Sequence, residues 1–448
     1  MDAPAFLTSQ LLVSLLVITV VIHLVLGLAG FSTYLERKIS AYIQDRIGPN
    51  RVGFDLGLPF LSFLKGLWGL GQPLADGIKF ILKEDYCPKH ADKALFTLAP
   101  IIVVIPALIG FAVIPWGGQI DIPQWTVPFL KWTVAAQTVT VAAASINIGV
   151  IYLLAVGSLS IYGITLAGWA SNNKYSFLGA LRSSAQMISY EIPMGLSILT
   201  VLLITGSLLP ERIIAYQAQH GWLLLSQPLA GIIFFICILA ECNRTPFDNA
   251  ECEQELVGGY HTEYGAMRWA LFFLAEYSHM ITASAFFAVL FLGGYHLPLG
   301  LSAGNTHILS PENHTVLGAI LKFHVMLGKV MGIIFLMMLV RWTIPRLKFD
   351  QVLSVNWQGL IPLSILLVVI NAVLVHLELT GLPQTLAANL AVALVVLAIL
   401  PFLPRATSNH KVRIAGSRFF PLLGEGIITA PTDPRAREDR PIQGSALR

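Results

Sequence analysis

Long apolar runs alternate with short polar stretches along this chain of 448 residues. In a helix that rises about 1.5 Å per residue, about 20 apolar residues cross the hydrocarbon core of a bilayer. The pattern therefore predicts an all-α polytopic membrane protein with about nine transmembrane helices. We place them at residues 9–34, 95–115, 147–169, 178–206, 223–242, 266–295, 321–342, 357–378 and 386–404. Because no cation precedes the first run, we expect it to stay as a helix and not to act as a cleavable signal peptide.

The segment 73–84 has the pattern of an amphipathic helix. Its apolar residues share one helical face and its charged residues share the opposite face. The apolar residues are Leu74, Ile78, Ile81 and Leu82, and the charged ones are Asp76, Lys79 and Lys83. Since proline suits the first turn of a helix, Pro73 marks the start. We predict an interfacial helix lying on the membrane; a short helix packed on the protein's own core is the alternative.

Composition and charge agree with a membrane protein and add an orientation. The chain is 55% hydrophobic and 12% charged, outside the usage of soluble globular proteins. If the N-terminus lies outside, the segments placed inside hold all 28 Lys and Arg residues except Lys131, Arg212, Lys322 and Lys329. Because cytoplasmic loops are enriched in Lys and Arg, we predict an outside N-terminus and a cytoplasmic C-terminal tail.

This topology divides the chain into a transmembrane domain, 1–404, and a basic, mostly irregular cytoplasmic tail, 405–448. The domain has cytoplasmic loops at 35–94 and 243–265. In the outer loop 116–146, β-branched and polar residues alternate, which predicts a short strand or hairpin. No phosphate-binding glycine motif or nucleophile motif occurs, and the four cysteines lack metal-ligand spacing.

The segment 239–264 is the one inside loop that is acidic. It holds a single cation, Arg244, and six carboxylates: Glu241, Asp248, Glu251, Glu253, Glu255 and Glu263. Carboxylates crowded beside a bilayer repel one another and resist desolvation, so the pKa of some should be raised. Acidic groups at membrane depth are costly and are therefore candidates for function.

Two further carboxylates, Glu191 and Glu276, lie inside predicted spans. Pro193 has no N–H to donate to the carbonyl of Ser189, which predicts a kinked helix with a free carbonyl and room for water beside Glu191. We interpret these carboxylates as a proton relay. The alternative is that each is protonated and hydrogen-bonded between helices.

The inner end of the first span carries Glu36 beside Arg37, a pair suited to tuning each other's charge near a ligand entrance. A Gly-Pro-Asn turn follows, which we expect to fix Arg46 near the surface. Four histidines are solitary on apolar spans, and each fits a structural histidine better than a metal ligand. They are His23, His279, His324 and His376.

Five ordered motifs resemble those of one known family. They are ERK at 36–38, DRIGPNRVG at 45–53, ADGIKFILKED at 75–85, GWASNNKYSFLGALRSSAQMISYE at 168–191 and AECNRTPFDNAECEQELVGGYHTEYGAM at 240–267. Over about residues 10–378 the chain strongly resembles the H-subunit family of bacterial NADH–quinone oxidoreductase, respiratory complex I. The resemblance implies a subunit of a proton-translocating enzyme in the bacterial plasma membrane, assembled with other complex I subunits and without a nucleic-acid partner.

The resemblance also implies roles for residues. Glu36, Arg37 and Arg46 would line the quinone route, and helix 73–84 would sit at its mouth. Five loop acids would flank the quinone cavity: Asp248, Glu251, Glu253, Glu255 and Glu263. Glu241, Glu191 and Glu276 would form the first proton relay. The substrate would be ubiquinone or menaquinone; NADH, FMN and iron–sulfur clusters would belong to partner subunits, with no cofactor or metal on this chain.

The chain departs from this family in three places. ECNRTPFDNAECEQELV stands where relatives commonly read ETNRTPFDLPEAEAELV, residues 57–70 look like an insertion, and the ninth span and tail exceed the shortest relatives. Three other functions stay open. They are a homologous subunit of a ferredoxin-, F420H2- or hydrogenase-linked complex, a stand-alone proton-coupled secondary transporter, and a passive anchor for a soluble oxidoreductase.

Overall fold

The computed structural model describes residues 8–54, 63–126, 133–250, 252–297 and 313–399. Contacts divide the chain into two units, Met1–Val392 and Ala393–Arg448. The first unit contains every element discussed below except the last turns of the final helix. Of the predicted features, Glu251, residues 57–62 of the insertion and the tail at 405–448 lie outside the described residues.

Eight helices in the described residues are long and apolar enough to cross a membrane. They are α1 (Ser9–Ile43), α3 (Lys93–Ile109) with its 3₁₀ extension to Val113, α4 (Gly149–Ala170), α5 (Lys174–Thr205), α10 (Ala266–Phe291), α11 (Val316–Thr343), the run of α12 (Phe349–Ser354) into α13 (Ile361–His376), and α14 (Leu382–Ile399). The predicted all-α polytopic membrane fold is confirmed.

The predicted span 223–242 is broken in the structure. It consists of α7 (Leu223–Ser226) and the shorter apolar helix α8 (Pro228–Glu241), which meet at Gln227. Proline at the first helical position has no N–H to bond backwards, so a new helix starts there. The break leaves a membrane helix of only 14 residues, which ends at Glu241.

The interfacial helix is present as α2 (Gln72–Leu82), with proline in its first turn. It contacts α1 and α10. None of its residues is buried, and Ile81 and Leu82 are 69% and 80% exposed. An exposed apolar face suits a helix that lies on a membrane and does not suit one packed into its own core.

The hairpin predicted within residues 116–146 is confirmed as two antiparallel pairs. β1 (Gln119–Ile122) pairs with β4 (Gln137–Thr140), and β2 (Trp125–Thr126) pairs with β3 (Thr133–Val134). Two further short α-helices are α6 (Pro210–His220), before α7, and α9 (Glu253–Leu256), in the acidic loop.

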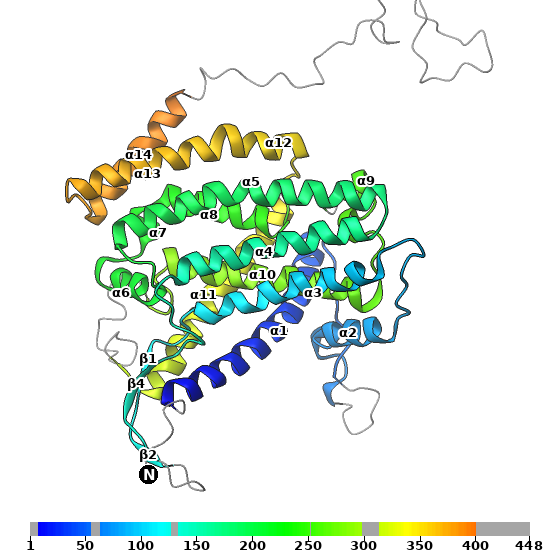
Figure 1. The fold of residues 1–448 in the computed structure, drawn as a ribbon, viewed down its shortest axis with the longest axis horizontal. Coiled ribbons are helices and arrows are strands. Elements are labelled where there is room, and N and C mark those ends of the chain that lie inside the picture. Colours follow the sequence, from blue (N-terminus) through cyan, green and yellow to red (C-terminus); the bar gives the residue numbers. More distant parts are fainter. Residues whose placement is uncertain (1–7, 55–62, 127–132, 251, 298–312, 400–448) are drawn as a thin grey trace, which may run out of the picture. The chain divides into compact units, whose positions relative to one another are not determined.

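The long helices of the first unit run side by side (Figure 1). Helix α3 packs on α4, and α4 packs on α5. Helix α5 also contacts α8 and α13, and α10 contacts α1, α3 and α11. Small residues allow the close approach: a Cβ on Gly163 would lie 2.4 Å from Cγ2 of Val103, and one on Gly168 would lie 2.3 Å from Cβ of Ala180. Membrane helices pack by such contacts because lipid supplies no hydrophobic drive between them.

The carbonyl that Pro193 cannot bond is not free, so the predicted water-accessible carbonyl is wrong. The side-chain amide of Asn356 donates to the carbonyl of Ser189 at 2.7 Å, and Asn356 is fully buried. Asn356 lies in a π-helical turn, Val355–Leu360, between α12 and α13. The partner comes from a helix 167 residues away along the chain, which the local sequence around Pro193 did not reveal.

A buried amide network holds α13 and α14 to the break before α8. Gln227 Nε2 donates to Asn371 Oδ1 at 2.6 Å, and Asn389 Nδ2 donates to Gln227 Oε1 at 3.0 Å. Amides that bond each other across helices satisfy groups that lipid could not.

Candidate functional site

The carboxylate of Glu36, near the C-terminal end of α1, is buried among hydrogen-bond donors. It is 8% exposed. Arg244 Nη1 donates to its two oxygens at 3.3 and 3.2 Å, and Arg341 Nη1 and the hydroxyl of Tyr277 also donate to it. A buried carboxylate is stable only when it is paired and hydrogen-bonded.

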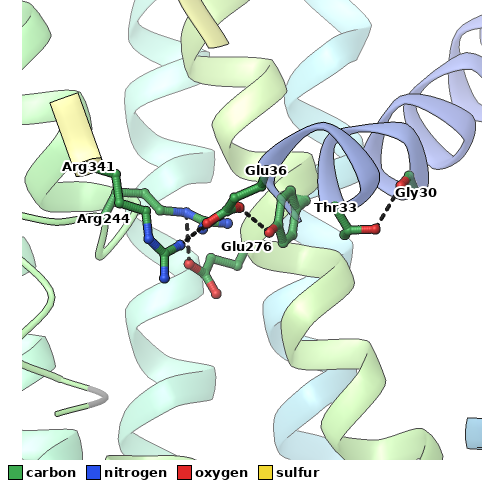
Figure 2. Close-up of polar contacts among 7 residues, drawn as sticks. Gly30, Thr33, Glu36, Arg244, Glu276 and Arg341 are labelled. Carbon is green, nitrogen blue, oxygen red and sulfur yellow. Dashed lines mark hydrogen bonds and ion pairs between the residues drawn. The ribbon is translucent and has the colours of Figure 1, made fainter. Parts of the chain in front are cut away.

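Arg244 joins Glu36 to a second carboxylate. Its Nε lies 3.1 Å from Oε1 of Glu276, and its guanidinium lies 4.3 Å from the ring centre of Tyr277 (Figure 2). Burial by itself would lower the pKa of Arg244, but Glu276, Tyr277 and Glu36 hold it well above its ordinary value. The arginine therefore stays charged and is shared by both acids. We call Glu36, Arg244, Glu276, Tyr277 and Arg341 the ion cluster.

The expected pairing of Glu36 with Arg37 is wrong. Arg37 Nη1 instead bonds Asp76 on α2 at 2.6 Å, and it is about half exposed. Consecutive residues of a helix point about 100° apart, so Glu36 faces the bundle while Arg37 faces α2. The two side chains serve different contacts.

An apolar groove of about 330 Å³ lies between α1, α2 and α10. Arg37 and Asp76 are among its few charged lining residues, and the rest are mostly apolar: Ala29, Pro73, Phe80, Ile81, Met267, Trp269, Leu271, Phe273 and Leu274 among them. Tyr277 also lines the groove. Its ring is therefore a wall of the groove while its hydroxyl belongs to the ion cluster.

A second polar group lies deeper along the helices. His279 Nε2, on α10, is 3.3 Å from Oε1 of Glu241, the last residue of α8. Glu191, on α5, bonds Ser158 and is within electrostatic range of Glu241 and His279. His279 was interpreted as a solitary structural histidine, but it has an acidic partner.

A small cavity connects the two groups. Its volume is about 30 Å³, and Glu276, Glu241 and His279 all line it. A space of this size holds about one water when several polar groups surround it. Two of the three predicted relay acids, Glu241 and Glu276, thus border the same cavity, and the third, Glu191, is within electrostatic range of Glu241.

Two acids of the loop after α8, Glu255 and Glu263, have different partners. Glu255 is exposed and pairs with Arg182 at 2.5 Å, while Glu263 accepts from Asn173 at 2.6 Å. The backbone carbonyl of Asp248 accepts from Arg346. The side chain of Glu253 and all of Glu251 lie outside the described residues.

Two of the predicted site residues, Glu263 and Arg46, are not part of the ion cluster. Glu263 lines a polar cavity of about 1030 Å³ together with His90, Asp92 and Lys174. Arg46, just past α1, is exposed, and it is not among the residues that line the apolar groove. Within the described ranges, no three His, Cys, Asp or Glu side chains gather as a metal site would require.

Sequence reasoning missed Tyr277, Arg341 and the role of His279. A usable signal existed for two of them: Tyr277 follows Glu276 directly, and His279 lies three residues beyond it, on the same side of the helix. Arg341 is in the last turn of α11. By the predicted topology, that turn and Glu36 are on the same side of the membrane, but nothing local connects them.

Comparisons with known proteins give consistent results. A family model described as NADH dehydrogenase matches residues 15–372. An NADH-quinone oxidoreductase H subunit of Cytophaga hutchinsonii, the one numbered 1, is 44% identical over 361 residues, 81% of this chain and 96% of the relative. The corresponding protein numbered 1 in Geobacter sulfurreducens is 43% identical over 361 residues, 81% and 94% of the two chains. That of Leptospira biflexa is 45% identical over 346 residues, 77% and 89% of the two chains.

Proposed function

Since the chain belongs to the NADH dehydrogenase family and, like its relatives, is a membrane subunit of an NADH–quinone oxidoreductase, we propose that it guides quinone to the ion cluster and starts a proton relay there. One observation carries this proposal. Tyr277 is both a wall of the apolar groove and a hydrogen-bond donor to Glu36, so a ligand in the groove touches the cluster through one side chain.

The groove has the chemistry that a quinone requires. A quinone is a small polar ring on a long apolar tail, and the groove is lined mainly by apolar and aromatic side chains. The exposed apolar face of α2 beside it suits the membrane surface, where the tail would enter. The Arg37–Asp76 pair gives its wall a polar point for the ring.

The ion cluster can respond to the redox reaction. Reduction of a quinone to a quinol takes up two electrons and two protons, and the electrons come from cofactors on partner subunits. Negative charge that forms near Tyr277 raises the proton affinity of nearby carboxylates. Arg244 is bonded to both Glu36 and Glu276. When one of these acids takes up a proton, Arg244 interacts more strongly with the other, so the two acids titrate as a coupled pair.

The relay would continue from Glu276 to Glu241 and then to Glu191. Glu276 and Glu241 line the same small cavity, and Glu191 is within electrostatic range of Glu241. A proton that leaves the cluster thus has acidic groups at short intervals between helices. Movement of this proton would link quinone reduction to translocation by the rest of the complex.

We assign the remaining predicted acids and Arg46 to the surface that meets the partner subunits. Asp248, Glu251, Glu253, Glu255 and Glu263 belong to one loop, and the basic-inside pattern favours the cytoplasmic side for this loop and for Arg46. In this orientation the N-terminus is outside and the tail is cytoplasmic. The partners there would hold the flavin, the iron–sulfur clusters and the groups that bind the quinone ring.

Glu191→Gln tests the relay, because glutamine keeps the size and hydrogen bonding of the side chain but takes up no proton. We expect the complex to assemble and its coupled quinone reduction and proton pumping to fall at least tenfold. Glu211→Gln is the matched control, because Glu211 is also a partly buried acid but lies on α6, outside the proposed path. Full pumping by the Glu191 variant would refute the relay.

Purification in mild detergent from native membranes tests the assembly. A tagged chain should bring down a flavin- and iron–sulfur-containing complex that reduces quinone with NADH. Recovery of the chain alone, with proton-coupled transport in vesicles, would contradict the proposal and favour a stand-alone transporter.

A further inference from the structure

His279 differs from three other helical histidines, His23, His220 and His324, in what its ring contacts. The Nδ1 atoms of His23, His220 and His324 each lie 2.7–3.1 Å from the carbonyl four residues earlier on their own helix. Such bonds need no second helix and no charge. His279 instead directs Nε2 to a carboxylate of another helix, 3.3 Å away.

Room for this pair is made by a glycine on a third helix. A Cβ on Gly157, in α4, would lie 3.2 Å from Oε1 of Glu241 and 3.9 Å from Cε1 of His279. The first distance is tighter than ordinary van der Waals contact, so a side chain here would press on the carboxylate. The neighbouring residue, Ser158, bonds Glu191. One turn of α4 therefore borders both acids.

His279 is close to the acids of both steps of the proposed path. It lines the small cavity with Glu276 and Glu241, and it is within electrostatic range of Glu191. The imidazole is the side chain that exchanges protons most readily near neutral pH, and its two nitrogens can accept on one side and release on the other. A structural role alone requires neither property.

We propose that His279 is a proton-carrying residue that passes protons from Glu241 to Glu191. The inference rests on the proposed function, whose relay it deepens. A proton on Oε1 of Glu241 moves to Nε2 of His279, which leaves a carboxylate and an imidazolium. The imidazolium then releases its Nδ1 proton to the carboxylate of Glu191, which becomes a carboxylic acid. One proton has moved, and the ring resets by exchanging its tautomer.

The groups around the ring allow its titration to be read. Glu241 faces it from α8, Glu191 from α5 and Glu276 from its own helix, while Cys242 and Tyr260 line the same cavity. The parts of α3 and α4 that border this cavity contribute Val103, Ala107, Ser160 and Ile164, none of which is charged. A pH dependence that disappears on substitution of His279 is therefore due to the ring or to an acid coupled to it.

The test uses the intact membrane complex with His279→Gln and, as a second variant, His279→Asn. Both amides can bond Glu241, but neither can carry a proton. We expect both complexes to assemble, to lose at least tenfold in coupled turnover and protons pumped per electron, and to lose the corresponding step in the pH profile. His324→Gln, which replaces a histidine bonded to its own helix, should behave as wild type.

Glu241→Gln and Glu191→Gln, assayed alongside, separate two kinds of failure. Loss of pumping in these variants with wild-type pumping and pH profile in His279→Gln leaves the relay standing and overturns the role of His279. Full pumping in both acid variants overturns the relay and the inference with it.

If the variants do not assemble, an infrared measurement on the wild-type complex still tests the proposal. In wild-type complex with ¹⁵N-labelled histidine, quinone reduction should produce an imidazole-to-imidazolium difference band. Absence of any such band would also overturn the proposal.

Discussion

Replacing Tyr277 by phenylalanine removes one hydroxyl at the point where the apolar groove meets the ion cluster. That hydroxyl donates to Oε2 of Glu36. The ring would keep its place, because it lies 4.3 Å from the guanidinium of Arg244 and 4.8 Å from the ring centre of Phe273. The variant therefore removes a hydrogen bond and leaves the packing and the other donors to Glu36.

The size of the effect follows from the charge of the acceptor. A hydrogen bond to an ionised group contributes about 1.5–3 kcal/mol, roughly twice a neutral one. If quinone chemistry changes the charge of Glu36, this loss enters the barrier, and about 1.4 kcal/mol corresponds to a tenfold change in rate. We therefore expect kcat/KM for quinone to fall by about 10- to 100-fold.

The assay measures NADH-driven reduction of a short-chain quinone by the purified complex, with kcat and KM separated. NADH oxidation by an artificial acceptor, which does not use the quinone site, should be unchanged. Tyr190→Phe is the matched control: its hydroxyl is as deeply buried but donates to the neutral carbonyl of Val352 at 3.0 Å. A Tyr277 variant within twofold of wild type would refute the link between the groove and Glu36.

Three further predictions concern stability. Lys329→Met should lower the free energy of unfolding in SDS titration by about 3 kcal/mol or more, because Nζ donates to three backbone carbonyls just after α10. Gln227→Leu should lower it by about 2–3 kcal/mol, because Asn371 and the other amides of the network lose a buried partner. Burial raises the pKa of Glu211, against its own backbone bond and a bond to Ser145. The folded protein therefore holds the proton of Glu211 more tightly than the unfolded chain does. The free energy of unfolding falls as pH rises from the pKa of this carboxyl in the unfolded chain to its higher pKa in the folded protein. Glu211→Gln should melt like wild type near pH 4 and at a higher temperature at pH 8.

Each of the three stability predictions has a control variant or a result that would contradict it. Lys322→Met removes one bond, from Nζ to the carbonyl of Asn313, and should cost less than Lys329→Met; equal losses would contradict the first prediction. An unchanged unfolding free energy for Gln227→Leu would show that the amides re-pair. Parallel melting curves for Glu211→Gln and wild type from pH 4 to 8 would show that burial does not bias its protonation.

Sequence alone was sufficient for the membrane fold. The thickness of the bilayer sets the length of a span, and the run of apolar residues that meets it is a local property. The same holds for α2, whose seven patterned residues lie within three turns, and for the hairpin from β1 to β4. The prediction of one continuous span at 223–242 was wrong because a single residue, Pro228, starts a new helix. The prediction of a free carbonyl at Ser189 was wrong because Asn356, distant in sequence, donates a hydrogen bond to it.

Sequence also selected the acids of the candidate site, because a carboxylate within an apolar run is costly and conspicuous. Glu191 and Glu276 were found in this way, while Glu241 was found within the acidic segment 239–264 and Glu36 beside Arg37 at the charged end of the first span. It could not find their partners. Glu36 and its partner Arg341 are 305 residues apart. Arg37, which is next to Glu36 in the sequence, bonds Asp76 instead.

Only the tertiary structure decided which charges meet. Whether two side chains pair depends on which helix faces pack together and at what depth, and neither is a property of a single helix. The sequence placed His279 on an apolar span as one histidine among four. Packing of α10 against α8 set it beside Glu241, in the space that Gly157 of α4 leaves open.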